Sequence, residues 1–358
     1  MTEFEHKLQQ IRAVLETTRL SGIVFRSSAW FAWATCGGSN AVLLTTDSGV
    51  AEVLVTPNGA WILTDEIEAE RLAQEEIPVG FEWLIHPWAD VKAGGKFIRE
   101  MASDLIASDM PRSGEIELPP QLAVLQASLH PAELERYRVL GRDAACAMTD
   151  VLLEAKPTWT GYQLAGAASE RLWGMGIHPA LTLVGDEQRL PLYRHSTAHS
   201  NPIGSRAMLV FCARRHGLYA NLTRFVYFRK PSKLELKINS DVMQIEAEIL
   251  AASRVGATLG SVYQKLVSAY QNSGHEHGEN KHHQGGTCGY GARDAIALPD
   301  SRVQIREHNA VAWNPSLVGA KIEDTMVVSS TGSEVLTTDS RWENTTINGI
   351  LRPNLLLR

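Results

Sequence analysis

The chain has 358 residues, of which 44% are hydrophobic and 21% are charged, and its formal net charge is −6 at pH 7. This length suggests two domains of ordinary size, and the composition is typical of a soluble globular protein. Nucleic-acid binding needs clustered Lys and Arg, which this acidic chain does not favour, and no run of about 18 apolar residues is present to span a membrane.

The N-terminal stretch is charged and amphipathic, without the apolar segment of a secretory signal. The four cysteines are scattered and form no C-x-x-C pair. We therefore expect reduced thiols in a cytoplasmic protein.

Short apolar and polar patterns alternate through the first third of the chain. Apolar spacing predicts a helix over 4–19. Strand patterns follow at 22–25, 41–45, 53–56 and 61–64, and helical patterns at 65–76 and 92–108. The loop with Arg26, Trp30 and Trp33 lies between the first two strands. We predict a small α/β domain over residues 1–128.

The remaining residues, 129–358, predict a larger α+β domain. Pro131 suits the first turn of a long helix ending near Lys156. A helix over 161–175 follows, then strands within 179–229, helices over 231–255 and 259–272, and strands within 286–338.

Four segments in this domain stand in an order that resembles the pita-bread family of creatinase, aminopeptidase P and prolidase. They are Leu181–Asp186 with His195 shortly after, Gly217–Arg224, His282–Gly289 and Gly319–Val328. The resemblance implies a pita-bread C-terminal domain preceded by a smaller α/β domain of the creatinase type. It also implies a homodimer in which the N-terminal domain of one subunit covers the active site of the other. Trp30 or Arg26 would then line the partner's active site.

The family's metal site, built from two Asp, one His and two Glu, is not matched. The first Asp falls within Leu209–Cys212, and the other positions fall on Asn221, Gly286, Asn314 and Glu323. Between Glu187 and Glu235 there is no Asp or Glu, so a shifted alignment would not supply the missing aspartate ligands either. Two divalent cations need anionic oxygen ligands. We therefore expect no metal and no other cofactor.

The resemblance nevertheless leaves candidate catalytic groups. His195 matches the histidine that serves creatinase as base and acid, a role that suits its ordinary pKa. His282 matches a second active-site histidine, and Glu323 is placed to bind a cationic or amidine group or to orient His195. Structural roles are the alternative for each.

Substrate-binding candidates surround these groups: His283, Gln284, Arg293, Asn221 and Asn314, besides Trp30 and Arg26. Arg293 suits a carboxylate, and the amides suit an amide or urea-like group. Because neighbouring strand residues point to opposite faces, only one of His282 and His283 is expected to face the site.

The resemblance thus implies a metal-independent, creatinase-like hydrolase or lyase that acts on a C–N bond of a small, polar, nitrogen-containing molecule. One alternative is a non-catalytic ligand- or peptide-binding module, as in the large subunit of the FACT histone chaperone. A second alternative is a metal-dependent Xaa-Pro peptidase, which the missing ligands disfavour. Neither a nucleic acid nor a membrane is expected as a partner.

Overall fold

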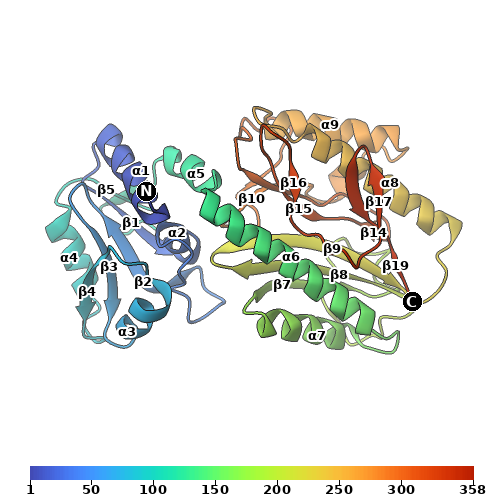
Figure 1. Cartoon of the computed structure of the whole chain (residues 1–358), viewed down its shortest axis with the longest axis horizontal. Coiled ribbons are helices and arrows are strands. Elements are labelled where there is room, and N and C mark those ends of the chain that lie inside the picture. The colour runs from blue at the N-terminus through green and yellow to red at the C-terminus, as the bar shows by residue number, and fades with distance from the viewer. The chain divides into compact units, whose positions relative to one another are not determined.

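The computed structural model describes all 358 residues, which form two compact units. The first consists of Met1–Glu133 with His216–Leu218, and the second of Leu134–Arg215 with Tyr219–Arg358. Figure 1 traces the chain from blue to red through both units.

The first unit is an α/β structure around a mixed six-stranded sheet, ordered β4-β3-β2-β1-β5-β6. Its strands are β1 (Gly22–Ser27), β2 (Ser48–Val55), β3 (Ala60–Asp65), β4 (Glu82–His86), β5 (Ile106–Ser108) and β6 (Glu115–Glu117). Its helices are α1 (Glu3–Thr18), α2 (Ser28–Ala34), α3 (Ala69–Arg71) with the π-helical turn η1 (Leu72–Glu76), α4 (Ala93–Met101) and α5 (Pro120–Ala127).

Local sequence explains where α1 begins and which face it buries. Thr2 and Glu5 form a reciprocal capping box at its start. Ile11, Val14 and Leu15 form a buried stripe at helical spacing. The helix predicted over 4–19 is thereby confirmed.

Three predictions for the first unit are wrong. Residues 41–45 form no strand, because Asn40 instead donates to the carbonyls of Arg26 and Ala51 and holds this segment as a loop. The helical stretch predicted over 92–108 ends at Met101, and residues 106–108 instead form strand β5, which pairs in parallel with β1. Trp30 and Trp33 lie on helix α2, capped by Ser27, rather than on a loop.

The second unit contains two main sheets, ordered β19-β9-β8-β7 and β11-β10-β12-β15-β16. The first comprises β7 (His178–Gly185), β8 (Arg206–Arg215), β9 (Leu218–Tyr227) and β19 (Leu356–Leu357). The second comprises β10 (Gly285–Cys288), β11 (Ala295–Ile296), β12 (Ala310–Trp313), β15 (Asp324–Val327) and β16 (Glu334–Val335). Two hairpins pair β13 (Ser316–Leu317) with β14 (Ala320–Lys321) and β17 (Asn344–Ile347) with β18 (Ile350–Pro353).

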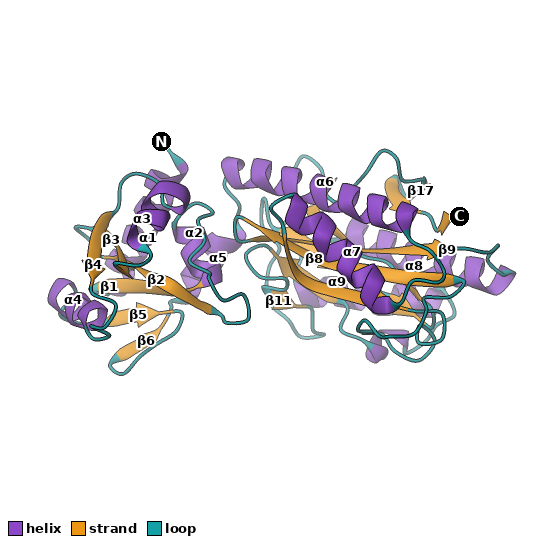
Figure 2. Ribbon diagram, turned by 90° about the horizontal axis from the view of Figure 1, so that it is seen from below, coloured by secondary structure: helices purple, strands orange, loops and turns teal.

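Four helices cover these sheets: α6 (Pro131–Glu154), α7 (Gly161–Gly174), α8 (Lys233–Ala252) and α9 (Leu259–Asn272), with the short 3₁₀ turn η2 (Gly278–Lys281) before β10. Figures 1 and 2 show α6 and α7 beside the β7–β9 sheet. Helices α8 and α9 pack on β12 and β15 through a core that includes Ile249, Tyr270 and Trp313. The predicted α+β class is confirmed.

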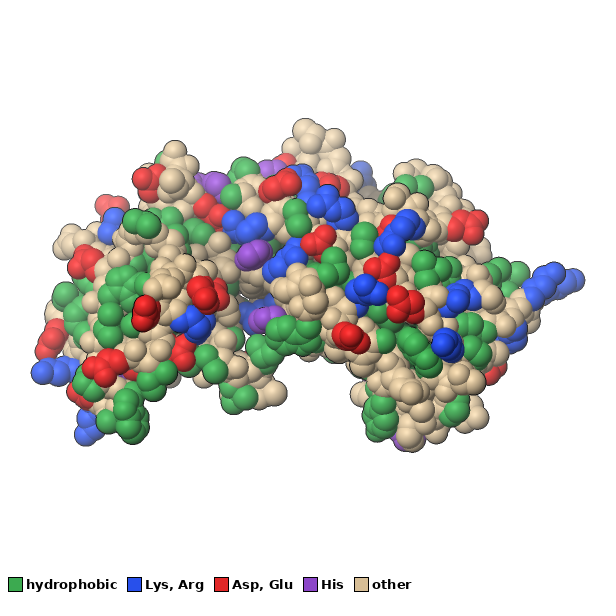
Figure 3. Space-filling view, turned by 60° about the horizontal axis from the view of Figure 1, so that its bottom comes forward, with side chains coloured by type: hydrophobic (Ala, Val, Ile, Leu, Met, Phe, Trp, Pro, Cys, Tyr) green, Lys and Arg blue, Asp and Glu red, His purple; other side chains and the backbone are tan.

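Figure 3 shows acidic and basic side chains intermingled on the face it presents. None of the helices has the length and apolar character needed to cross a membrane.

Candidate active site

Three histidines meet in the second unit. His195 lies in the loop between β7 and β8, and His282 and His283 directly precede β10. The Nε2 atoms of His195 and His282 are 2.6 Å apart, and their rings meet edge to face. The ring of His283 stacks on that of His282, with centroids 4.4 Å apart, and lies 5.6 Å from that of His195. The prediction that only one of the adjacent pair faces the site is wrong, because both residues precede the regular strand.

The surroundings keep all three imidazoles neutral near pH 7. His195 is exposed at the surface, but the partial burial of its ring, followed by the charge of Lys321, lowers its pKa below the usual value. The same two causes lower the pKa of His282 to about 2. Burial and the charge of Arg293 lower the pKa of His283 to about 4. In a neutral pair, one of the two facing Nε2 atoms carries the proton that joins them, so His195 and His282 exchange protons as one unit.

Glu323, the last of the family's ligand positions, lies at the centre of a buried ionic cluster. Its carboxylate accepts hydrogen bonds from the guanidinium of Arg293 and from Thr223 Oγ1, the latter at 3.0 Å. Lys321 Nζ lies 3.8 Å from the same carboxylate. Burial acts to raise the pKa of Glu323, but Lys321 and Arg293 together hold it below its usual value. Glu323 is therefore an anion that protein cations already bind.

The predicted amides fall into two groups. Asn221 Nδ2 and Arg293 Nη1 donate to one carbonyl, that of Ala292, at 3.3 and 2.6 Å, which places these two side chains together. The Oδ1 atoms of Asn221 and Asn314 are buried and have no hydrogen-bond partner. Two acceptors thus remain for N–H groups of a ligand.

Gln284 belongs to the second group, because the protein uses its whole amide. Its Nε2 donates to the carbonyls of Glu279 and His282, and its Oε1 accepts from Tyr270. These contacts indicate that Gln284 positions His282. They do not favour the predicted role of Gln284 in binding substrate.

Strand β10 carries Gly286 at the position where the resemblance places the family's histidine ligand. Gly286 has φ +155°, and a Cβ there would lie 2.0 Å from the carbonyl oxygen of Ala295. That backbone conformation and that contact both favour glycine. No side chain, and so no ligand, can project from this position without a shift of the backbone.

The residues present do not fit the family's dinuclear metal centre. The corresponding positions hold Asn221, Gly286 and Asn314, together with a segment ending in Cys212 whose thiol has its pKa raised to about 12 by burial. The remaining carboxylate, Glu323, is bound by side-chain cations. Two divalent cations at this position would find a single carboxylate, that of Glu323, which is already paired with Arg293 and Lys321. The positive charges of these two side chains would repel the metal ions.

The histidines form a second set of potential ligands, with ligand atoms within 4.8 Å of one another. However, the 2.6 Å between two of the nitrogens is shorter than the roughly 3.3 Å that follows from tetrahedral zinc–nitrogen bonds of about 2.0–2.1 Å. The charges of Lys321 and Arg293 act on the same rings and would repel a cation. The geometry therefore fits proton exchange better than metal binding.

Two residues of the site were missed by the sequence reasoning. Lys321 and Thr223 both approach Glu323. A signal existed for Lys321, because it stands two residues before Glu323, and alternate residues of a strand share a face. Thr223 offered none, since it contacts Glu323 across 100 residues of sequence.

Cys288 is a buried, protonated thiol. Burial raises its pKa to about 12, and its Sγ lies 3.5 Å from the Tyr137 hydroxyl. A nucleophile must be a thiolate at working pH, so Cys288 is a packing residue.

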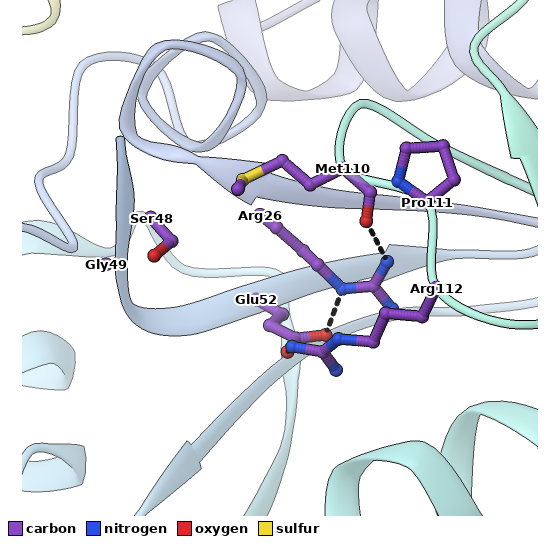
Figure 4. A pocket seen from close by; sticks show the side chains of 7 residues that line it. All are labelled: Arg26, Ser48, Gly49, Glu52, Met110, Pro111 and Arg112. Atoms are coloured by element: carbon purple, nitrogen blue, oxygen red, sulfur yellow. Dashed lines mark hydrogen bonds and ion pairs between the residues drawn. The ribbon is translucent and has the colours of Figure 1, made fainter. Parts of the chain in front are cut away.

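The two candidates from the N-terminal domain have contacts within the first unit. The guanidinium of Arg26 binds Glu52 and Glu115 and donates to Ser108 and to the Met110 carbonyl. It lines a cavity of about 500 Å³ with Arg112 and others, drawn in Figure 4. Trp30 stacks on Phe25 at 5.5 Å. These contacts give Arg26 a structural task, and the role of both residues in a partner's site stays a prediction.

Comparison with known proteins decides the family. The sequence profile of metallopeptidase family M24 matches residues 135–330, which is more than half of the chain. The chain belongs to metallopeptidase family M24. The resemblance to creatinase, aminopeptidase P and prolidase is thereby confirmed, as is the pita-bread fold of the larger domain. No curated protein sequence matches the chain.

Solved structures extend the similarity of fold over nearly the whole chain. An Xaa-Pro dipeptidase from Bacillus anthracis has a TM-score of 0.79 at 16% identity, covering 99% of this chain and 100% of its own. An X-Pro aminopeptidase from Thermotoga maritima has a TM-score of 0.79 at 14% identity, and the match covers 98% of this chain and 99% of its own. The N-terminal domain of the FACT complex subunit SPT16 from Eremothecium gossypii has a TM-score of 0.69 at 15% identity, and the match covers 94% of this chain and 97% of its own. The fold therefore occurs in named peptidases and in a subunit of a complex.

Proposed function

We propose that this M24 chain is a metal-independent hydrolase that breaks a C–N bond in a small, polar, nitrogen-containing molecule. The observation that carries the proposal is the neutral His195–His282 pair, joined at 2.6 Å, beside a buried ionic cluster at the family's metal position. Such a pair can take a proton from water and return it, which is general base and acid catalysis.

Each group has a task in this scheme. The histidine pair removes a proton from the attacking water, and the same proton is later given to the leaving nitrogen. The free Oδ1 atoms of Asn221 and Asn314 accept hydrogen bonds from substrate N–H groups. Arg293 and Lys321 supply the positive charge that orients the substrate, a task that metal ions also perform in metallohydrolases.

The proposal is tested by a screen of amides, ureas, amidines and dipeptides in buffer with a chelator. We expect turnover of a compound in one of these classes by wild-type protein, with no increase when Mn²⁺ or Co²⁺ is restored. His195→Ala is expected to lose that turnover. Turnover that requires added metal would reject the proposal in favour of the metal-dependent Xaa-Pro peptidase.

A non-catalytic binding module is the second candidate, because the fold also occurs in a FACT subunit domain. A binder has no need of a proton-exchanging pair, so the contact between His195 and His282 favours an enzyme. Saturable peptide binding that is unchanged in His195→Ala, with no turnover of any small amide, would favour the binder.

A further inference from the structure

Two buried ionic clusters lie on neighbouring residues, Glu323 and Asp324. Asp324 belongs to a cluster of two arginines, Arg224 and Arg352, and two carboxyl groups, its own and that of Glu246. Each arginine in that cluster therefore has a carboxyl partner, and burial raises the pKa of one of these carboxyl groups, that of Glu246, to about 8. This is the arrangement expected of buried ions whose role is structural.

The cluster around Glu323 has a different ratio of cationic side chains to carboxyl groups. Arg293 and Lys321 share this single carboxylate; the Lys321 side chain is buried, with 4% exposed, and that of Arg293 is largely covered, with 13% exposed. The neighbouring Asp294 reaches the surface, although burial raises the pKa of its carboxyl group to about 6; it accepts from the backbone of Gly291 and forms no ion pair with Arg293 or Lys321. The three histidines are neutral, so they add no negative charge. The cluster therefore has one more positive charge than negative charge. A poorly solvated charge of this kind is unfavourable unless an anion pairs with it.

The donors that remain free belong to the same two cations. The Lys321 ammonium makes no hydrogen bond with the protein, and its nearest anionic oxygen is 3.8 Å away on Glu323. Arg293 Nε is buried and also has no partner. Two charged donors are therefore available for an acceptor that the chain does not provide.

We infer that Lys321 and Arg293 form a binding site for the carboxylate of a small-molecule ligand, at the position where other M24 chains hold metal cations. A single surplus charge matches a monoanion better than the dianion of phosphate. A planar carboxylate also suits the fork of a guanidinium. The inference rests on the proposed function, which it deepens by naming the substrate class as carboxylic acids that carry N–H groups.

Binding of simple anions tests this site without a known substrate. Acetate, propionate and inorganic phosphate are titrated into wild type by calorimetry at constant ionic strength, with chelator present. We expect saturable binding of one carboxylate per chain, weaker binding of phosphate, and competition by chloride. Tighter binding of phosphate than of carboxylates would reject the carboxylate assignment.

Lys321→Met is the decisive variant, and Lys265→Met, at an exposed position of α9, is its control. We expect at least a tenfold loss of acetate affinity in Lys321→Met and none in Lys265→Met. Equal affinity in a folded Lys321→Met protein, or no saturable carboxylate binding by wild type, would overturn the inference. Near-ultraviolet circular dichroism establishes that the variant is folded.

A measurement on wild type covers the case in which Lys321→Met does not fold. An amine-specific reagent labels lysines, and mass spectrometry follows the peptide that contains Lys321. Acetate should slow the labelling of Lys321 and leave that of Lys265 unchanged, and an unchanged rate at Lys321 would reject the site. Since His195→Ala should keep acetate binding while losing turnover, failure of the anion site and failure of the proposed function are distinguishable.

Discussion

His195 Nε2 and His282 Nε2 lie 2.6 Å apart although 87 residues separate them in sequence. One comes from the loop after β7 and the other from the residues before β10, so the contact exists only in the folded unit. Burial and neighbouring cations disfavour a charge on either ring. This neutral, hydrogen-bonded pair is the centre of the proposed chemistry.

Replacing His195 by Ala should reduce turnover of the identified substrate by about 10²–10⁴-fold, the usual contribution of general acid–base catalysis. Steady-state kinetics measures the change. His199→Ala is the matched control, because His199 is an exposed histidine of the same loop. Equal losses in the two variants would show that His195 has no special role.

The depressed pKa of His282 predicts how stability depends on pH. Below its unfolded-state pKa of about 6.5, the unfolded chain binds a proton at His282 that the folded chain excludes, so the unfolding free energy falls with falling pH. Above that pH both states are neutral and the effect vanishes. His282→Gln should lessen the loss of stability between about pH 6.5 and 4 in urea denaturation. An unchanged slope would mean that His282 is protonated in the folded protein.

Gly286→Ala should destabilise the chain by more than about 3 kcal/mol, because backbone strain and a contact 2.0 Å from the Ala295 carbonyl act together. Gly332→Ala is the control, since Gly332 also has positive φ but open space around it. It should cost about 1 kcal/mol through strain alone. Similar melting temperatures for the two variants would show that the strand accepts a side chain at 286.

Glu323→Gln should cost about 3–5 kcal/mol of stability even in chelator, because it leaves two buried cations without their carboxylate. Glu334→Gln removes a surface ion pair with Arg138 and should cost at most about 1 kcal/mol. Urea denaturation compares them. If Glu323→Gln destabilised the chain only when metal was supplied, Glu323 would be a metal ligand after all.

Much of the fold was predictable from local patterns. Pro131 and apolar spacing located α6, and the capping residue Thr160 stands directly before α7. Segments whose structure depends on distant partners were not predictable. The three residues of β5 form a strand only because β1 and β6 flank them. Residues 41–45 have a strand-like composition, but Asn40 binds the adjacent sheet instead.

The site was predictable in its residue types and less so in its contacts. Family resemblance drew attention to His195, His282 and Glu323, which the fold places in one unit. It gave no indication that Arg293 binds Glu323, because that contact depends on how separate segments pack; for Lys321 the spacing of two residues from Glu323 was the available sign. The excess of buried cations becomes apparent only in three dimensions.

The central claim is that this M24 chain has replaced the metal centre by side-chain cations. Titration of chelator-treated wild type and Glu323→Gln with Mn²⁺ and Co²⁺, followed by elemental analysis, tests it most directly. We predict no binding of two metal ions per chain and no binding that depends on Glu323. Two equivalents of metal in wild type, lost in Glu323→Gln and accompanied by Xaa-Pro cleavage, would contradict it.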